Sequence, residues 1–529
     1  MRLDLVVGNA RIRTMDPAYP LAERVGVMHG RIVGLDRDLD GVSAAEVVDA
    51  RGRVVVPGFV DAHSHLAWAG LAAGAVDLTG AATIDQALGV IEAAAAQTDG
   101  WVDVIGYDQR PFGRHLTRED LDRAAPGRKV YVIHTSGHAH LVSTAVLDEL
   151  PEPPRGPGVV LEDGRPTGLF LEAATEIVNA LRTPYPLETL QKAIARAAET
   201  CAAQGITSVT EAGLGGGLTA RSPIEALAYQ NADLPIRTQL MVSLDALQAT
   251  QAHPADGVTR ALPLGLRSGF GNGRLSLGAA KTWLDGGMMA RTAALTEPYL
   301  GSDTCGDLAD VEEITEAACA AHAAGWQLAL HAIGDRAIDA ALEIVTTAQR
   351  RHPRPDPRHR IEHCGLVRPD QLPKLAEAQV TAVLQPTFLH AFGDDYAAVM
   401  GPDRAPWMYR GRSLLDHGIP IAGSSDRPVA DGAPLRAMQF MVERRSGSGR
   451  LIGPQETITV AEALHAYTMG AARACRTQHQ VGSITPGKYA DFTVLDADPF
   501  EVPTAELAAV PVTATVVGGQ LVHGTWSTR

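Results

Sequence analysis

The fold of this chain is predicted outward from one stretch, Val54-Val55-Val56-Pro57-Gly58-Phe59-Val60-Asp61-Ala62-His63-Ser64-His65. Its apolar, β-branched residues predict two strands, and Pro57-Gly58 between them predicts a change of direction. Because side chains two positions apart on a strand point to the same side, His63 and His65 can reach one metal ion together. The pair alone is weak support for a metal site, because the chain has 18 histidines and a second His-x-His pattern at His138-Ala139-His140.

Downstream of this stretch, apolar strands alternate with alanine-rich helical segments up to about residue 474. That alternation is typical of a parallel α/β fold. The predicted fold class is a (β/α)8 TIM barrel spanning 58–474, because the candidate strands reach the number that a closed barrel needs. The eight candidates are residues 59–65, 205–211, 236–244, 276–284, 327–331, 360–364, 381–385 and 419–424.

Short apolar strands joined by tight turns lie at both ends of the chain. Residues 1–57 have this texture, and residues 475–529 repeat it. Neither end has enough strands for a stable sheet sandwich by itself. We therefore expect the two ends to combine into one composite β-sandwich domain, which brings the termini together.

The gap between the first two predicted barrel strands is too long for a single crossover helix. Residues 70–185 contain a predicted helix, two further strands and a loop rich in proline and glycine at 151–168. We expect an inserted subdomain over the barrel mouth, where it would set substrate choice. An irregular stretch at 387–412 is expected to follow a later strand and to rim the same site.

Charge and cysteine usage narrow the class of partner. The formal net charge is −15, from 46 basic and 61 acidic residues, and no long run of one sign occurs. This argues against nucleic acid or an anionic membrane as a partner. The five cysteines form no C-x-x-C pair, which indicates reduced thiols. With no signal-peptide core and no apolar run of membrane-spanning length, the expected location is cytoplasmic.

Ligand-type residues recur at the predicted strand ends, and in a TIM barrel the carboxyl ends of the strands form the active face. In chain order they are His63 and His65 on the first strand, Lys281 on the fourth, His331 on the fifth, His363 on the sixth and Asp426 just beyond the eighth. Imidazoles with one carboxylate suit Zn²⁺, with Mn²⁺, Fe²⁺, Co²⁺ or Ni²⁺ as alternatives. Each histidine alone could be structural, but their recurrence at matching positions favours a metal site.

Lys281 is one of only five lysines in the chain. An ammonium group at the active face would be repelled by bound metal ions. A neutral lysine amine that captures carbon dioxide becomes a carbamate, an anion that can bridge two metals. Two simpler alternatives stay open at this point, a lysine that binds substrate and a lysine paired with Asp285.

Motifs along the chain resemble those of the amidohydrolase superfamily, and within it those of the branch of the N-substituted formamide deformylases, often called YtcJ-like. The resemblance covers nearly the whole chain. It rests on the segments VVVPGFVDAHSH, GITSVTEAG, KTWLDGG, LALHAIGDRAID, RIEHC, LQPTF, RSLLDHGIPIAGSSDRPV and GSITPGKYADFTVLDADP. The resemblance implies a composite β-domain, a barrel and a binuclear metal centre.

The resemblance also assigns roles to the candidate residues. His63, His65 and Asp426 would hold the more buried metal ion. His331 and His363 would hold the other, with carboxylated Lys281 and a hydroxide as bridges. The segment around His138 resembles an insertion motif of the branch, which makes His138 a candidate substrate contact and not a ligand.

The predicted activity is metal-dependent hydrolysis of a non-peptide carbon–nitrogen bond, as in an N-substituted formamide or an N-acyl compound. One or two divalent ions, with Zn²⁺ favoured, would activate a hydroxide for attack on the carbonyl. Asp426 is placed to accept the water proton and to pass it to the departing nitrogen. The alternatives are an ester, lactone or carbamate hydrolase and a non-catalytic regulatory member of the fold. A small-molecule substrate is the expected partner, and a homo-oligomer is compatible with the sequence.

Overall fold

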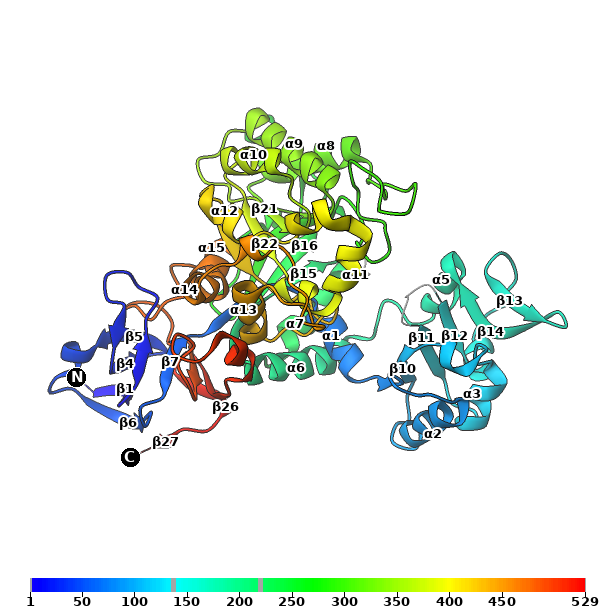
Figure 1. Ribbon diagram of the computed structural model, residues 1–529, viewed down its shortest axis with the longest axis horizontal. Coiled ribbons are helices and arrows are strands. Elements are labelled where there is room, and N and C mark those ends of the chain that lie inside the picture. The colour runs from blue at the N-terminus through cyan, green and yellow to red at the C-terminus, as the bar shows by residue number, and fades with distance from the viewer. Residues whose placement is uncertain (1, 135–138, 217–221, 529) are drawn as a thin grey trace. The chain divides into compact units, whose positions relative to one another are not determined.

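A computed structural model describes residues 2–134, 139–216 and 222–528 of the chain. The chain folds as two compact units. One is formed by Met1–Trp68 together with Ile194–Arg529, and the other by Ala69–Ala193. The predicted insertion, 70–185, lies within the smaller unit, which is drawn mainly in lighter blue and cyan in Figure 1.

The larger unit holds a sheet of eight parallel strands, in the hydrogen-bonded order β23-β22-β21-β20-β19-β16-β15-β8. They are β8 (Phe59–Ser64), β15 (Ile206–Leu214), β16 (Arg237–Ser243), β19 (Leu275–Trp283), β20 (Leu328–Ala332), β21 (Arg360–His363), β22 (Thr381–Leu384) and β23 (Ile421–Gly423). The predicted (β/α)8 barrel is confirmed, and every predicted strand coincides with an observed one.

The ends of the sheet, β8 and β23, meet through backbone hydrogen bonds just beyond the strands. The Asp426 N–H donates to the His63 carbonyl at 2.8 Å, and the His65 N–H donates to the Arg427 carbonyl at 3.0 Å. Below them, the Ser425 N–H donates to the Asp61 carboxylate at 3.0 Å. The seam of the barrel is therefore joined at the residues that were singled out as metal ligands.

Helices separate and follow the barrel strands. They are α1 (Leu66–Ala73), α6 (Leu187–Ala203), α7 (Ala226–Asn231), α8 (Val311–Ala323), α9 (Asp335–Arg351), α10 (Leu372–Glu377), α11 (Pro386–Arg404), α12 (Arg412–Asp416), α13 (Pro434–Glu443), α14 (Val460–His465) and α15 (Ala471–Ala474). The expectation of an irregular stretch at 387–412 was wrong, because α11 occupies most of it. Pro386 stands at the first helical position, where its fixed φ favours a helix, and Gly401, with φ of 76°, marks the kink.

Strands from both chain ends form two sheets, in the orders β27-β6-β1-β4-β5 and β26-β25-β24-β7-β2-β3. The strands are β1 (Arg2–Gly8), β2 (Arg11–Arg13), β3 (Leu21–Ala22), β4 (Val25–Met28), β5 (Arg31–Leu35), β6 (Ser43–Asp49), β7 (Val54–Pro57), β24 (Phe492–Leu495), β25 (Val512–Val517), β26 (Gln520–Gly524) and β27 (Ser527–Thr528). Ile12, Val27, Val55, Phe492 and Val516 share one buried core. The composite β-sandwich from both termini is confirmed, and Figure 1 shows its blue and red strands together.

Gly58 is the hinge between this sandwich and the barrel, because β7 ends at Pro57 and β8 begins at Phe59. A Cβ atom on Gly58 would overlap the side chain of Thr207. Only glycine lets the chain pass this close to β15, which explains the Pro57-Gly58 break in the apolar run.

The smaller unit has a sheet of its own, in the order β13-β14-β12-β11-β10-β9. Its elements are β9 (Val76–Asp77), α2 (Ile84–Ala95), β10 (Val102–Tyr107), α3 (Arg118–Ala124), β11 (Val130–His134), β12 (Ala139–Val142), α4 (Thr144–Leu147), β13 (Val159–Glu162), β14 (Arg165–Leu171) and α5 (Thr175–Asn179). The expectation of a loop at 151–168 was wrong in its second half. Asp163 and Gly164 have φ of 48° and 75°, so they form a tight turn between two hairpin strands.

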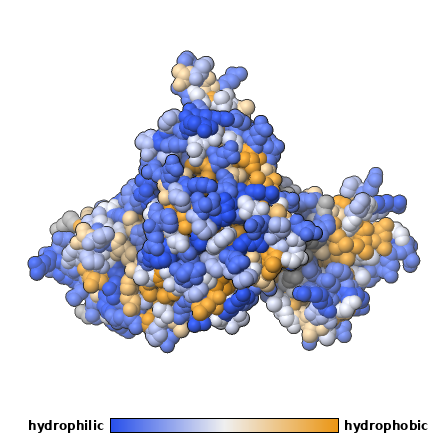
Figure 2. Space-filling model, turned by 45° about the horizontal axis from the view of Figure 1, so that its top comes forward, coloured by the Kyte–Doolittle hydropathy of each residue, from blue (hydrophilic) through white to orange (hydrophobic). Residues whose placement is uncertain are grey.

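None of the helices in the described part of the chain is long and apolar enough to cross a membrane. On the face drawn in Figure 2, hydrophobic residues form patches separated by hydrophilic ones.

Candidate metal centre

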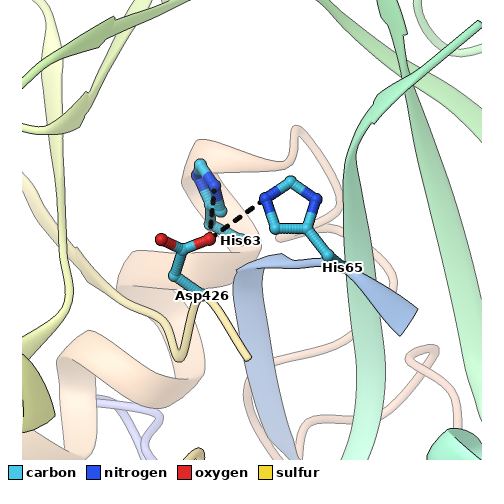
Figure 3. Close-up of side chains that lie close together, drawn as sticks. All are labelled: His63, His65 and Asp426. Atoms are coloured by element: carbon cyan, nitrogen blue, oxygen red, sulfur yellow. Dashed lines mark ion pairs between the residues drawn. The ribbon is translucent and has the colours of Figure 1, made fainter. Parts of the chain in front are cut away.

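Three of the predicted ligands form one buried group. The ligand atoms of His63, His65 and Asp426 all lie within 4.8 Å of one another. Asp426 Oδ1 is 3.3 Å from His63 Nε2 and 3.1 Å from His65 Nε2, as the dashed lines in Figure 3 show. Two imidazole nitrogens and a carboxylate oxygen thus converge at the active face of the barrel. This donor set is one that zinc and similar divalent ions prefer.

Several polar atoms around this group are buried without a hydrogen-bond partner among the described residues. They include His63 Nε2, Asp426 Oδ1, Lys281 Nζ and His363 Nδ1. Buried polar atoms in native proteins are nearly always paired, so unpaired atoms at one place need an explanation. A divalent cation would satisfy the imidazole nitrogens and the carboxylate together, and the residues present therefore fit a metal ion.

His331 and His363 lie beside this group. The His363 ring is 5.1 Å from the His63 ring and 4.3 Å from the His331 ring, centroid to centroid. Burial lowers the pKa of His363 to about 3 and that of His331 well below its usual value. Both rings are therefore neutral, the form that binds metal. Among the described residues, however, they are not part of a group of three ligand atoms within 4.8 Å.

Lys281 is fully buried on β19, with Nζ 4.7 Å from the centre of the Trp283 ring. Burial lowers the pKa of Lys281 to about 8. Its pairing with Asp285, one of the alternatives left by the sequence, is not found, because Lys281 Nζ has no hydrogen-bond partner in the described part of the chain. The lowered pKa increases the fraction of neutral amine, which is the form that carbamate formation requires.

The backbone is strained at two of the predicted ligands. His363 has φ of 69° and Asp426 has φ of 53°, values that residues other than glycine rarely adopt. Each costs about 1–3 kcal/mol and persists only where the surrounding structure imposes it. At Asp426 the hydrogen bond from its N–H to the His63 carbonyl is one such constraint.

Buried carboxylates that the sequence reasoning missed lie behind the histidines. Glu362 Oε2 is 2.5 Å from His63 Nδ1, and Glu211 Oε1 is 3.4 Å from His65 Nδ1. Arg360 keeps the pKa of Glu362 well below its usual range although burial opposes ionisation. The available signal was an acidic residue inside an apolar strand, which is rarely buried unless it is paired.

The pKa of His65 is shifted in the opposite direction from those of His331 and His363. Burial alone would lower the pKa of His65, but the carboxylates of Asp426 and Glu211 outweigh it and raise that pKa to about 9. The same carboxylates would attract a metal cation to this position.

The second His-x-His pattern lies in the smaller unit. His140 Nδ1 is 2.7 Å from the Tyr131 hydroxyl, which accounts for this nitrogen without a metal. His138, the predicted substrate contact, lies outside the described residues. Its role and that of the insertion in substrate choice stay predictions.

The chain is similar to known proteins over nearly its whole length. It is 30% identical to the protein LONG AFTER FAR-RED 3 of Arabidopsis thaliana, over 98% of this chain and 91% of that protein. It is also 30% identical to an N-substituted formamide deformylase of Arthrobacter pascens, over 98% of both chains.

A crystal structure of an uncharacterized metal-dependent hydrolase from Pyrococcus horikoshii superposes with a TM-score of 0.80 at 26% identity, covering 95% of this chain and 99% of that one. A family model described as "Amidohydrolase family" matches residues 46–523. The predicted resemblance is confirmed, and the chain belongs to the amidohydrolase family.

Proposed function

We propose that this chain is a metal-dependent hydrolase of a non-peptide carbon–nitrogen bond, such as that of an N-substituted formamide or another N-acyl compound. The observation that carries the proposal is the convergence of His63 Nε2, His65 Nε2 and Asp426 Oδ1 in one buried group. Family membership alone would not suffice, because one fold hosts many functions. The match to a formamide deformylase over 98% of both chains supports the choice of bond.

The proposed cofactor is one or two divalent ions, most simply Zn²⁺. His63, His65 and Asp426 would hold the first ion, and His331 and His363 would hold the second. Lys281, buried with an unpaired Nζ, would carry a carboxyl group and bridge the two. When bound, a divalent ion supplies a Lewis acid that lowers the pKa of water and polarises a carbonyl.

Asp426 is the proposed proton shuttle. Its Oδ1 lies between the Nε2 atoms of His63 and His65, so the carboxylate can meet a proton released at that point. The neighbouring His63 and His65 rings keep the pKa of Asp426 well below its usual value, although burial opposes ionisation. The ionised carboxylate would accept the proton of the attacking water and deliver it to the departing nitrogen.

Two measurements together test this proposal. Elemental analysis of the purified, metal-replete protein should find up to two transition-metal ions per chain. A substrate screen should then pair each formamide and N-acyl amine with the ester of the same acyl group. Faster turnover of the amides supports the proposal. Turnover of esters, lactones or carbamates alone would replace it with hydrolysis of those bonds, and a trace metal content would contradict it.

A further inference from the structure

Glu362 lies behind His63, away from the converging ligand atoms. Its Oε2 is 2.5 Å from His63 Nδ1, and Arg360 donates through Nη2 to the same oxygen at 2.9 Å and through Nε to the other oxygen. Both oxygens are therefore acceptors already engaged by a permanent donor. His63 must place its proton on Nδ1 to complete this arrangement, which leaves Nε2 as the free nitrogen.

Glu211 has the same relation to His65. Its Oε2 accepts from the Leu66 N–H at 2.8 Å and from the Tyr229 hydroxyl. Its Oε1 is 3.4 Å from His65 Nδ1. Again the proton belongs on Nδ1, and Nε2 faces Asp426.

Asp285 contacts His331 at Nε2, whereas Glu362 and Glu211 contact their histidines at Nδ1. Its carboxylate accepts three backbone N–H groups, from Ile333 at 3.0 Å, Gly334 at 2.7 Å and Ala294 at 3.0 Å. His331 Nε2 is 3.4 Å from Asp285 Oδ1 and 3.4 Å from the Gly286 carbonyl. Since both neighbours are acceptors, Nε2 carries the proton and Nδ1 is left free.

We infer that Glu362, Glu211 and Asp285 are positioning residues that hold one tautomer each, so that His63 and His65 offer Nε2 and His331 offers Nδ1 to the metal centre. The inference rests on the proposed function, because it concerns how the same centre takes up metal. The three carboxylates come from three different parts of the barrel, β21, β15 and the segment after β19. Each carboxylate contacts the ring nitrogen that faces away from the centre and so fixes the orientation of that ring.

A purely structural role explains Glu211 less well. Glu211 is 2% exposed, and among the described residues its ion-pair partner is His65. An amide would satisfy Leu66 and Tyr229 equally well with its oxygen and would avoid burying a charge. What an amide would not provide is an acceptor at His65 Nδ1.

Glu211→Gln is the test. Its oxygen can keep Leu66 and Tyr229, but its NH₂ group then faces His65 Nδ1 and forces the proton of that ring onto Nε2. Residues that hydrogen-bond the second ring nitrogen of a metal-binding histidine typically contribute 10–100-fold to metal affinity. We therefore expect the Zn²⁺ dissociation constant, measured by chelator competition, to rise by about 10–100-fold. The visible absorption spectrum of Co²⁺-loaded protein should change as well, because the coordination of that ion changes.

The matched control is Glu456→Gln, the same substitution at a carboxylate that is also 2% exposed. Glu456 accepts from the Ser413 N–H at 2.9 Å and pairs with Arg410, and it contacts no predicted ligand. Glu456→Gln should lower the melting temperature of the metal-free protein and leave Zn²⁺ affinity unchanged. Glu211→Gln with wild-type affinity and a wild-type Co²⁺ spectrum would overturn the inference.

Should Glu211→Gln fail to fold, Asp285→Asn applies the same test to His331. The Asn oxygen can keep Gly334 and Ala294, and its NH₂ group then faces His331 Nε2. Affinity for the second Zn²⁺ equivalent should fall by about 10–100-fold, and an unchanged affinity would overturn the assignment. A wild-type protein that binds no Zn²⁺ gives a different result, since it refutes the proposed function itself.

Discussion

His65 and His140 are the second histidines of two identical His-x-His patterns, yet their surroundings give them opposite properties. His65 is buried and His140 is partly buried. The carboxylates of Asp426 and Glu211 raise the pKa of His65 to about 9, whereas burial lowers that of His140 to about 4. His140 meets a tyrosine hydroxyl and His65 meets two carboxylates. The carboxylates around His65, and not the histidine spacing, therefore distinguish the candidate metal site from the second pattern.

The largest effect should come from removing a ring at one pattern and not at the other. His65→Ala removes a ligand from the group of three, so we expect loss of tightly bound metal and of hydrolysis. His140→Ala removes a ring of the same kind, and metal content should stay at the wild-type level. Elemental analysis of both variants after identical metal loading checks this, and equal metal loss in the two would erase the contrast.

Asp426→Asn tests the carboxylate half of the contrast. The amide keeps the shape and one ligand oxygen but cannot accept a proton. Metal should be largely retained while kcat falls by about 10² or more. Wild-type turnover in a metal-replete Asp426→Asn protein would remove Asp426 from proton transfer.

Lys281→Ala asks whether a bridging anion is needed beside the histidines. We expect the variant to lose the metal of the second site and most of its activity. Short carboxylic acids should restore part of both by supplying the missing anion. Two results would contradict a carbamate. One is native mass spectrometry that finds Lys281 unmodified, and the other is a crystal structure in which Lys281 is unmodified and remote from bound metal.

A third pair of histidines has no carboxylate contact among the described residues, and it sharpens the comparison through the pH dependence of stability. The Leu328 N–H donates to His359 Nδ1 at 2.9 Å, so His359 Nε2 must donate to His322 Nδ1, 2.9 Å away, and His322 Nε2 to the His352 carbonyl. Both rings are neutral in this chain of bonds. Burial lowers the pKa of His322 and lowers that of His359 well below 6.5.

The sign of the pH effect follows from these lowered values. Unfolded histidines titrate near 6.5 and bind protons that the folded pair excludes, so the pair's contribution is complete above pH 6.5 and is lost as the pH falls below it. Each histidine contributes about 1.4 kcal/mol per pH unit to that loss. Urea midpoints of the metal-free protein between pH 7.5 and 5.5 should fall more steeply for wild type than for His359→Asn. Parallel slopes would contradict the assigned tautomers.

The smallest effect is expected in the inserted unit. His138→Ala should change KM or the order of substrate preference while metal content stays near normal. Equal losses across all substrates together with metal loss would instead make His138 a structural residue or a ligand.

The sequence predicted the barrel well because each strand is an apolar run and the candidate ligands stand at strand ends. The position of Glu362 inside an apolar strand was a signal of a paired carboxylate, but its contact with His63 could not be predicted. Strand alternation would turn Glu362 and His363 to opposite sides, yet the left-handed backbone at His363 brings both toward His63. Such a φ value is imposed by tertiary contacts and leaves no local signature in a non-glycine residue.

The hairpin at β13 and β14 shows the other kind of miss. Proline and glycine in 151–158 led to the prediction of a loop across the strand that follows. Asp163-Gly164 between two apolar segments is nevertheless a recognisable turn signal. That information was present in the sequence and was outweighed by composition.

The most direct test of the metal centre is a crystal structure of the Zn²⁺-loaded chain with anomalous diffraction recorded at the zinc edge. We predict a zinc peak within about 2.0–2.2 Å of His63 Nε2, His65 Nε2 and an Asp426 oxygen. A peak bound elsewhere, or no peak in a chain whose His63, His65 and Asp426 keep their present positions, would contradict the account.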